Sequence, residues 1–122
     1  MSAPRARERG QATVEFALIL PILAMAILAV LQVALVVRDR IAVVHAAREA
    51  ARAASVEPDP SGAIRAARRS LPGAEVHVGR RGKIGEPIAV VVTFTSHTDL
   101  PLVGPLFPDP VLESRVVMRI ER

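Results

Sequence analysis

The chain has no cysteine, no tryptophan and no tyrosine among its 122 residues. The absence of cysteine excludes a disulfide framework, a thiolate metal site and a thiol nucleophile. A domain of this sequence outside the cytoplasm must therefore rely on packing or on assembly with neighbours. Aromatic residues make up only 2% of the chain, so it has few of the side chains on which single-strand nucleic-acid binders stack bases.

The chain is basic, with 16 Lys and Arg residues and a net charge of +4. Basic domains can bind phosphate backbones electrostatically. Here the positive charges are scattered over the N-terminal segment, residues 38–52, residues 65–69 and the C-terminal tail. This dispersal argues against nucleic acid as a partner.

Hydrophobic residues make up 51% of the chain, and they are concentrated in one place. Residues 16–37 contain no charge and are interrupted only by Pro21 and Gln32. At about 1.5 Å of rise per residue this run reaches roughly 30 Å as a helix, the thickness of the hydrocarbon core of a bilayer. We therefore predict a single transmembrane helix over residues 11–37.

The first ten residues, 1–10, form a short polar leader that contains Arg5, Arg7 and Arg9. An ordinary secretory signal has an apolar region of about 7–15 residues followed by an Ala-x-Ala-like cleavage site. The apolar run here is longer, and Ala24-Met25-Ala26 falls inside it, so we do not expect conventional signal-peptidase cleavage. Arginines lie equally close on both sides of the run, which leaves its orientation open on charge alone.

Helical character continues beyond the apolar run into a stem, residues 38–56, which contains no Gly or Pro. At about 100° per residue the charged side chains fall on one face of this helix, and small apolar side chains fall on the opposite face. The small face would let a sheet or a second helix approach closely. Its members are Val43, Ala47, Ala50 and Ala54, and those of the charged face are Arg38, His45, Arg48, Glu49 and Arg52.

Residues 57–122 are expected to form a small α+β head, because Pro58 and Pro60 end the stem helix. Ser61 is a suitable N-cap for a short helix over residues 62–71. Alternating apolar side chains then predict three strands, at residues 75–78, 88–95 and 115–121. The fold class is therefore α+β, with a long N-terminal helix packed on a small antiparallel sheet.

Two connections in the head have alternative interpretations. The segment Gly79–Gly85, GRRGKIG, has glycines and basic side chains that could cradle phosphate, but no strand-to-helix context follows, which favours a hairpin turn. The Pro-broken apolar segment Leu100–Leu112 is expected to fold back over the sheet. An exposed apolar patch in this segment would instead mark a partner surface.

The sequence contains no recognisable catalytic or metal-binding pattern. His45, His77 and His97 are far apart and have no carboxylate at metal-site spacing. No Ser, His and Asp fall in a nucleophile arrangement, and no Gly-rich loop opens a helix. We therefore expect no enzymatic activity, no metal and no cofactor.

Glu15 stands directly before the start of the apolar run, and it has two interpretations. The simpler is a residue in the first helical turn, with Thr13 as N-cap, where the helix dipole stabilises a negative charge by about 0.3–1 kcal/mol. The other follows from the whole string RGQATVEFALILP. A basic leader ending in Gly10, then Gln11, then Glu15-Phe16 and a long apolar helix resembles the class III signal of type IV pilin-like proteins.

The start of the chain, the stem AAREAARAA and the tail VVMRIER together resemble the TadE/TadG-like minor pilins, or pseudopilins, of the Tad (Flp) pilus system. This resemblance implies that a prepilin peptidase recognises Gly10, Gln11, Glu15 and Phe16 and cuts after Gly10. It also implies a single-pass protein of the cytoplasmic membrane, with its N-terminus in the cytoplasm and its head outside. The implied partners are the peptidase, other Tad pilins or pseudopilins and the inner-membrane Tad assembly platform.

In pilin-like assemblies, the glutamate is thought to pair with the new amine of an adjacent subunit, here that of Gln11. Pro21 would kink the helix and help it to leave the bilayer. The implied role is a structural or initiating subunit of a secretion and adhesion apparatus, which would enter the pilus shaft, cap it or remain in the membrane. The alternatives are an uncleaved single-pass signal-anchor protein whose head binds a partner, and a peripheral subunit of an envelope enzyme.

Overall fold

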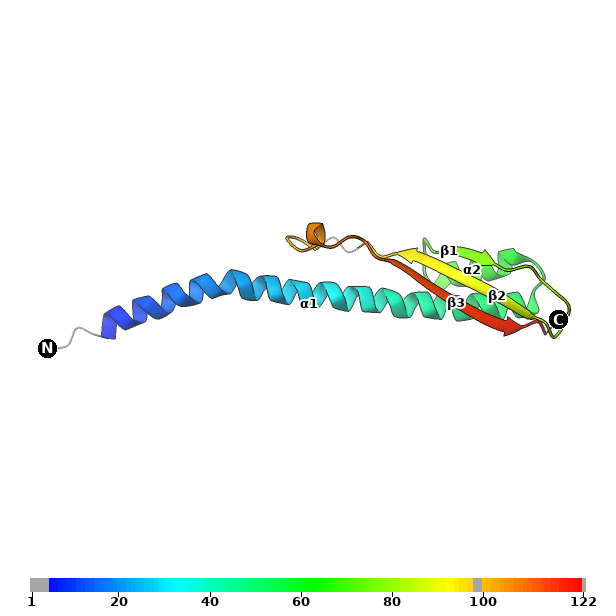
Figure 1. Ribbon diagram of the computed structural model, residues 1–122, viewed down its shortest axis with the longest axis horizontal. Helices are drawn as coiled ribbons and strands as arrows, with labels where there is room; N and C mark the ends of the chain where they lie inside the picture. Colours follow the sequence, from blue (N-terminus) through cyan, green and yellow to red (C-terminus); the bar gives the residue numbers. More distant parts are fainter. Residues whose placement is uncertain (1–4, 98–99, 122) are drawn as a thin grey trace. The chain divides into compact units, whose positions relative to one another are not determined.

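The computed structural model describes the backbone of residues 5–97 and 100–121. Within these described residues it contains two α-helices, three strands and one 3-10 helix (Figure 1). The helices are α1 (Arg5–Val56), α2 (Pro60–Ser70) and the 3-10 helix η1 (Gly104–Leu106), and the strands are β1 (Glu75–Val78), β2 (Pro87–Thr95) and β3 (Val111–Arg119). The α+β class is therefore confirmed.

The chain divides into two compact units. The first consists of Met1–Ala34 with Asp99–Pro108, and the second of Leu35–Thr98 with Asp109–Arg122. We call the first the anchor unit and the second the head unit. The grouping of Asp99–Pro108 with the anchor unit contradicts our expectation that this loop folds back over the sheet. Leu102, Leu106 and Phe107 of this loop are exposed, which matches the alternative of an exposed apolar patch.

In the anchor unit, α1 is apolar on every side. Side chains at successive positions are exposed, among them Leu18, Ile19 and Leu20. A stable helix that is hydrophobic all round is typical of a membrane span. Among the residues that the structure describes, α1 between Gly10 and Val56 is the one helix long and apolar enough to cross a membrane.

The start of α1 differs from the expectation that Thr13 caps it. The helix begins at Arg5, so Thr13 lies inside it and Glu15 lies in its third turn. The physical reason is that the leader after Pro4 is built from Arg, Ala and Glu, which are good helix formers. In the uncleaved chain Glu15 is therefore not a first-turn residue.

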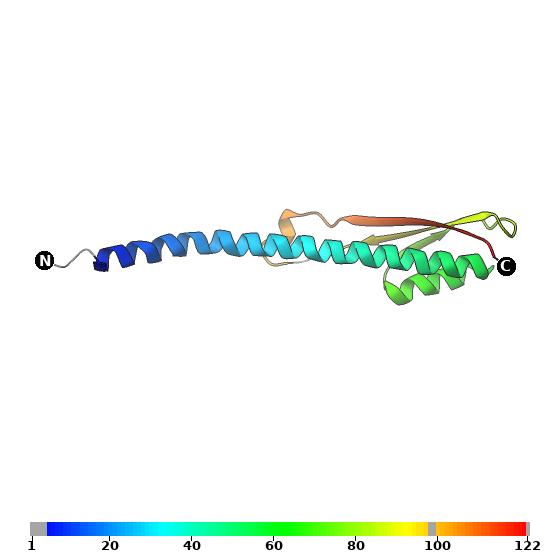
Figure 2. The same cartoon turned by 90° about the horizontal axis from the view of Figure 1, so that it is seen from below.

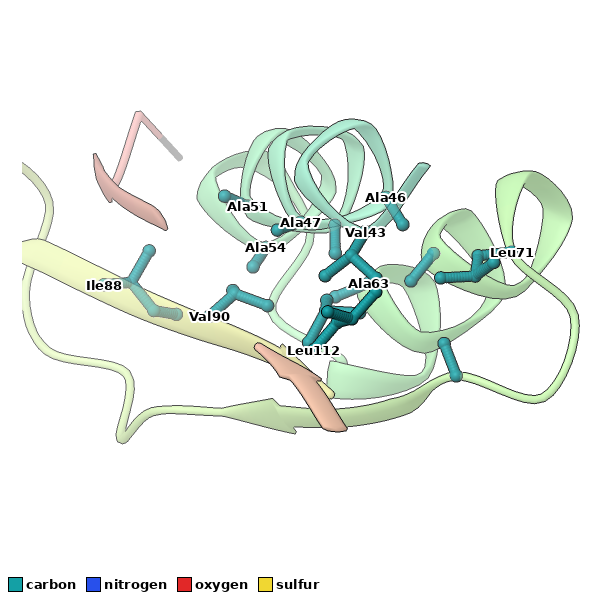
Figure 3. Close-up of a cluster of buried hydrophobic side chains, with 14 of the residues drawn as sticks. Val43, Ala46, Ala47, Ala51, Ala54, Ala63, Leu71, Ile88, Val90 and Leu112 are labelled. Carbon is teal, nitrogen blue, oxygen red and sulfur yellow. The ribbon is translucent and has the colours of Figure 1, made fainter. Parts of the chain in front are cut away.

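In the head unit, α1 packs through its face of small side chains, as expected. Val43, Ala47, Ala50 and Ala54 are buried in one apolar cluster. Figure 3 shows Ala63 of α2 and the side chains of β2 meeting this face. Alanine leaves room for a second backbone to come close, so both α2 and the sheet pack against α1.

Helix α2 is capped by Asp59, and our assignment of Ser61 as its N-cap is wrong. The Asp59 carboxylate accepts hydrogen bonds from the Ser61 backbone N–H at 2.9 Å and from the Ser61 hydroxyl at 2.6 Å. Pro60 follows the cap as the first helical residue, where its fixed φ and missing N–H suit a helix start. The Asp-Pro pair therefore starts the helix at Pro60, two residues earlier than an N-cap at Ser61 would allow.

The sheet is an antiparallel meander in the order β1-β2-β3. Ile88, Val90 and Val92 of β2 are buried and face α1, as Figure 3 shows for the first two. Strand β3 begins at Val111, four residues earlier than its apolar alternation predicts. Leu112 pairs with Phe94 of β2 and is buried, so this sheet register extends the strand across the polar pair Glu113-Ser114.

Polar contacts tie α1 to the ends of the sheet within the head unit. The Asp39 carboxylate accepts a hydrogen bond from the Ser96 hydroxyl at 2.5 Å. The Arg40 guanidinium donates to the Glu113 backbone carbonyl at 2.6 Å, and Glu121 N–H donates to the Ser55 carbonyl at 2.9 Å. These contacts fix the stem of α1 along the sheet.

The segment Gly79–Gly85 connects β1 to β2, as its hairpin interpretation predicts. Its Arg81 also has a role that the sequence does not reveal. The Arg81 Nη1 donates to the carbonyls of Ala54 and Glu57 at 2.7 and 2.9 Å. Carbonyls at the end of a helix lack intrahelical partners and carry partial negative charge. Arg81 therefore caps the C-terminus of α1.

Candidate processing and assembly site

The residues of the predicted processing site lie on successive turns of α1 in the anchor unit. Gln11 and Glu15 are one turn apart, and the Gln11 side-chain Nε2 donates a hydrogen bond to the Glu15 Oε1 at 3.0 Å. Positions four apart on a helix lie on the same face. The structure therefore brings the predicted mature first residue together with the predicted assembly glutamate.

Gly10 is exposed and helical, and the peptide bond to Gln11 is part of α1. A Cβ added at Gly10 would meet nothing within 4 Å, so no packing requires glycine here. Glycine in a helix costs about 1 kcal/mol relative to alanine. Because proteases reach a helical bond through local opening, Gly10 makes the bond after it easier to expose.

Glu15 and Phe16 are both exposed, so a carboxylate stands at the margin of the apolar surface of α1. An isolated charge drawn into hydrocarbon costs several kcal/mol and seeks a partner. The hydrogen bond from Gln11 uses one carboxylate oxygen. An ionised carboxylate has further acceptor positions, so Glu15 can accept a second, charged donor at the same time.

Pro21 lies inside α1, which stays helical on both sides of it. Proline has no N–H, so the hydrogen bond to the carbonyl of Ala17 is missing at this point. In lipid, neighbouring helices can satisfy such a carbonyl. The role of Pro21 as a kink stays a prediction.

No metal centre is formed by the residues that the structure describes, which contain no group of three His, Asp or Glu side chains placed to hold an ion. The histidines do not converge. His97 Nδ1 lies 2.8 Å from the Asp109 carboxylate in an exposed pair, and His45 and His77 are exposed on α1 and β1. An open groove within the head unit lies between α1 and α2, where Ser70 donates to Glu49.

The fold and the site together define a protein with one N-terminal helix capable of spanning a membrane and a small α+β head. Residues 10–52 match the family model described as TadE-like protein. The chain is thus similar to TadE-like proteins over the span and the stem, and the resemblance is confirmed there. This family is associated with Tad pilus systems and is a structural, non-enzymatic kind of protein.

The match begins at Gly10 and contains Gln11, Glu15, Phe16 and Pro21. The tail VVMRIER and the rest of residues 53–122 lie outside it. No curated protein and no solved structure matches the chain. The likeness to known proteins is therefore carried by α1.

Proposed function

We propose that the chain is a membrane-anchored minor pilin, or pseudopilin, of a Tad pilus system. A prepilin peptidase removes residues 1–10, and the mature chain acts as a structural or initiating subunit in pilus assembly. The observation that carries the proposal is the spacing from Gly10 to Glu15-Phe16, at the edge of a lipid-length apolar helix, inside a TadE-like match.

Cleavage after Gly10 would change the electrostatic surroundings of Glu15. In the uncleaved chain Glu15 lies in the third turn of α1, where the helix dipole has little effect. In the mature chain Gln11 would open the helix with a charged α-amine, and Glu15 would lie close to the new helix start. Removal of the leader thus places the carboxylate next to positive charge that the uncleaved chain lacks.

Assembly would use this charge between neighbouring chains. Glu15 accepts from the Gln11 side chain of its own chain and has acceptor positions left for the amine of a neighbour. A charge pair in lipid forms only when the two helices are in the correct axial register, while their apolar surfaces supply the packing. The proposed partners are therefore the peptidase, other Tad pilins or pseudopilins and the inner-membrane assembly platform.

The proposal places the leader in the cytoplasm and the head outside it. The alternative is an uncleaved signal-anchor protein whose head binds a partner, in which Gly10 and Glu15 coincide with the pilin pattern by chance. The two differ in whether residues 1–10 remain on the mature chain.

The experiment that tests the function deletes this chain in its native host and restores it from a plasmid. We expect loss of Tad pilin from the sheared cell-surface fraction on deletion and its return with the wild-type chain. Unchanged pilin in that fraction after deletion would contradict a role in assembly. An inactive peptidase serves as the control, because it abolishes surface pilin by a separate route.

A further inference from the structure

We propose that the segment Leu100–Pro108, the apolar loop, lies in the interface of the lipid bilayer beside α1. The chain then contacts the membrane at two places, through its span and through this loop. The inference rests on the proposed membrane anchor and extends it to a segment outside the TadE-like match. The partner surface is lipid.

The placement of the loop supports this partner. Asp99–Pro108 forms one compact unit with Met1–Ala34, which contains most of the apolar run. Figures 1 and 2 both show η1, drawn in orange, beside the blue-to-cyan stretch of α1 within this unit. A loop that packs on the span near its end continues the lipid-facing surface of that span.

The burial of Gln32 in the apolar run supports the position of the loop beside α1. Gln32 is the one amide in the apolar run, and it is only 5% exposed. Val103 of the loop is 1% exposed. A lone helix does not bury its own side chain, and the anchor unit consists of the part of α1 up to Ala34 and the segment Asp99–Pro108, so we infer that the loop covers Gln32. An amide facing hydrocarbon is costly, and this cover removes it from lipid.

The outward side of the loop is apolar. Leu102, Leu106 and Phe107 are 70%, 65% and 51% exposed, and Leu100–Pro108 contains no charge. Leu102 also has a φ of 70°, in the left-handed region that favours glycine. Such strain costs on the order of 1–2 kcal/mol for a residue other than glycine. In water, an exposed leucine at this position has no favourable contact that offsets the backbone strain. In lipid, the free energy of transferring its exposed side chain out of water offsets this strain.

The backbone of the loop can also tolerate an apolar environment. Pro101, Pro105 and Pro108 have no N–H to satisfy. The N–H groups of Gly104, Leu106 and Phe107 donate within the loop, to the carbonyls of Leu100, Val103 and Gly104. Non-helical backbone at the membrane requires such internal satisfaction.

The absence of cysteine allows a direct test with the full-length chain. Leu106→Cys and Phe107→Cys are each labelled with an environment-sensitive fluorophore, and the chain is placed, one copy each, in lipid discs of phosphatidylcholine and phosphatidylglycerol. Quenching by a nitroxide-labelled lipid is compared with quenching by aqueous iodide. Val30→Cys, in the span, is the lipid control, and Val117→Cys, exposed on β3, is the aqueous control.

We expect both loop labels to lose fluorescence to the lipid nitroxide, as the Val30 label does, and to resist iodide. Iodide quenching like that at Val117, with the Val30 label still in lipid, overturns the loop proposal and leaves the membrane anchor standing. Protection from both quenchers also overturns it, because protein would then cover the loop. Iodide quenching at Val30 shows that the membrane anchor itself is wrong.

Discussion

The side-chain amide of Gln11 lies 3.0 Å from the carboxylate of Glu15, one turn further along α1. The contact joins the residue that would become the mature N-terminus to the acidic residue directly before the apolar run. In the uncleaved chain it is a neutral donor on a charged acceptor. Cleavage would add a positive charge on the same residue, so the pair has a different electrostatic role in the two forms.

Glu15→Gln should separate processing from assembly. The amide has the same size and still accepts from Gln11, but it has no charge to pair with the amine of a neighbour. We expect the leader to be removed as in the wild-type chain, and the mature chain to be lost from the assembled fraction. Glu15→Asp, which keeps the charge with a shorter reach, should restore part of the assembly. Full assembly of the Gln variant would show that Glu15 has no pairing role.

Arg81→Ala should weaken the head without affecting the anchor. The guanidinium donates to two carbonyls at the C-terminus of α1, and we expect a loss of about 1–2 kcal/mol in the free energy of unfolding of the head. The measurement is hydrogen exchange at the β2 amides in the full-length chain, which should speed up about 5- to 30-fold. Arg80→Ala, at an exposed neighbour, is the matched control and should leave exchange unchanged. Equal exchange rates in the Arg81 and Arg80 variants would show that Arg81 does not stabilise the end of α1.

Ala47→Leu should destabilise the contact of α1 with the rest of the head. Ala47 is fully buried among α2 and sheet side chains, where extra methylenes force side chains and backbone to shift. The expected cost is about 1–3 kcal/mol of unfolding free energy, measured by urea unfolding of the head. Ala34→Leu adds the same atoms at an exposed position of α1 and should change little. A stable Ala47 variant would mean that the interface is looser than the structure shows.

The Asp59 cap predicts a loss of head stability in acid. Hydrogen bonds from the Ser61 hydroxyl, then from its backbone N–H, lower the pKa of Asp59 below its ordinary 3.8, and Arg65 adds to the effect. The stabilisation by the Asp59 cap is therefore fully present above pH 3.8 and is lost as the pH falls through the lowered pKa of Asp59. Asp59→Asn keeps a good cap that does not titrate, so its unfolding midpoint should fall less in acid than that of the wild-type chain. If the unfolding midpoints of the two chains fell equally with pH, the Asp59 cap would not contribute to acid sensitivity.

Much of the fold follows from local sequence. The uncharged run from Phe16 to Val37 and the small face of the stem predict a long helix with one packed end. Alternation in β2 predicts its buried face. The predicted helix starts were wrong because more than one residue could serve as the N-cap. Asp59 caps α2 instead of Ser61, since Pro60 suits the first helical position. Helix α1 begins before Thr13 because the leader consists of helix-forming residues.

Other features depend on contacts between distant residues. Arg81 reaches the end of α1 across 27 positions to Ala54, and nothing near it in the sequence marks that role. The early start of β3 follows from its pairing with β2, and the apolar loop groups with the span rather than the sheet. The processing residues could be predicted from the sequence because their pattern is a local spacing, and their processing stays a prediction. The contact from Gln11 to Glu15 is also local.

Intact mass of the chain extracted from its native membrane tests the central claim most directly, with and without the prepilin peptidase. The account predicts loss of residues 1–10 only when the peptidase is present. It also predicts slower removal of the leader in Gly10→Ala, since an added Cβ has open space and strengthens the helix by about 1 kcal/mol. An uncleaved mass in both strains would contradict the account and leave a plain membrane anchor.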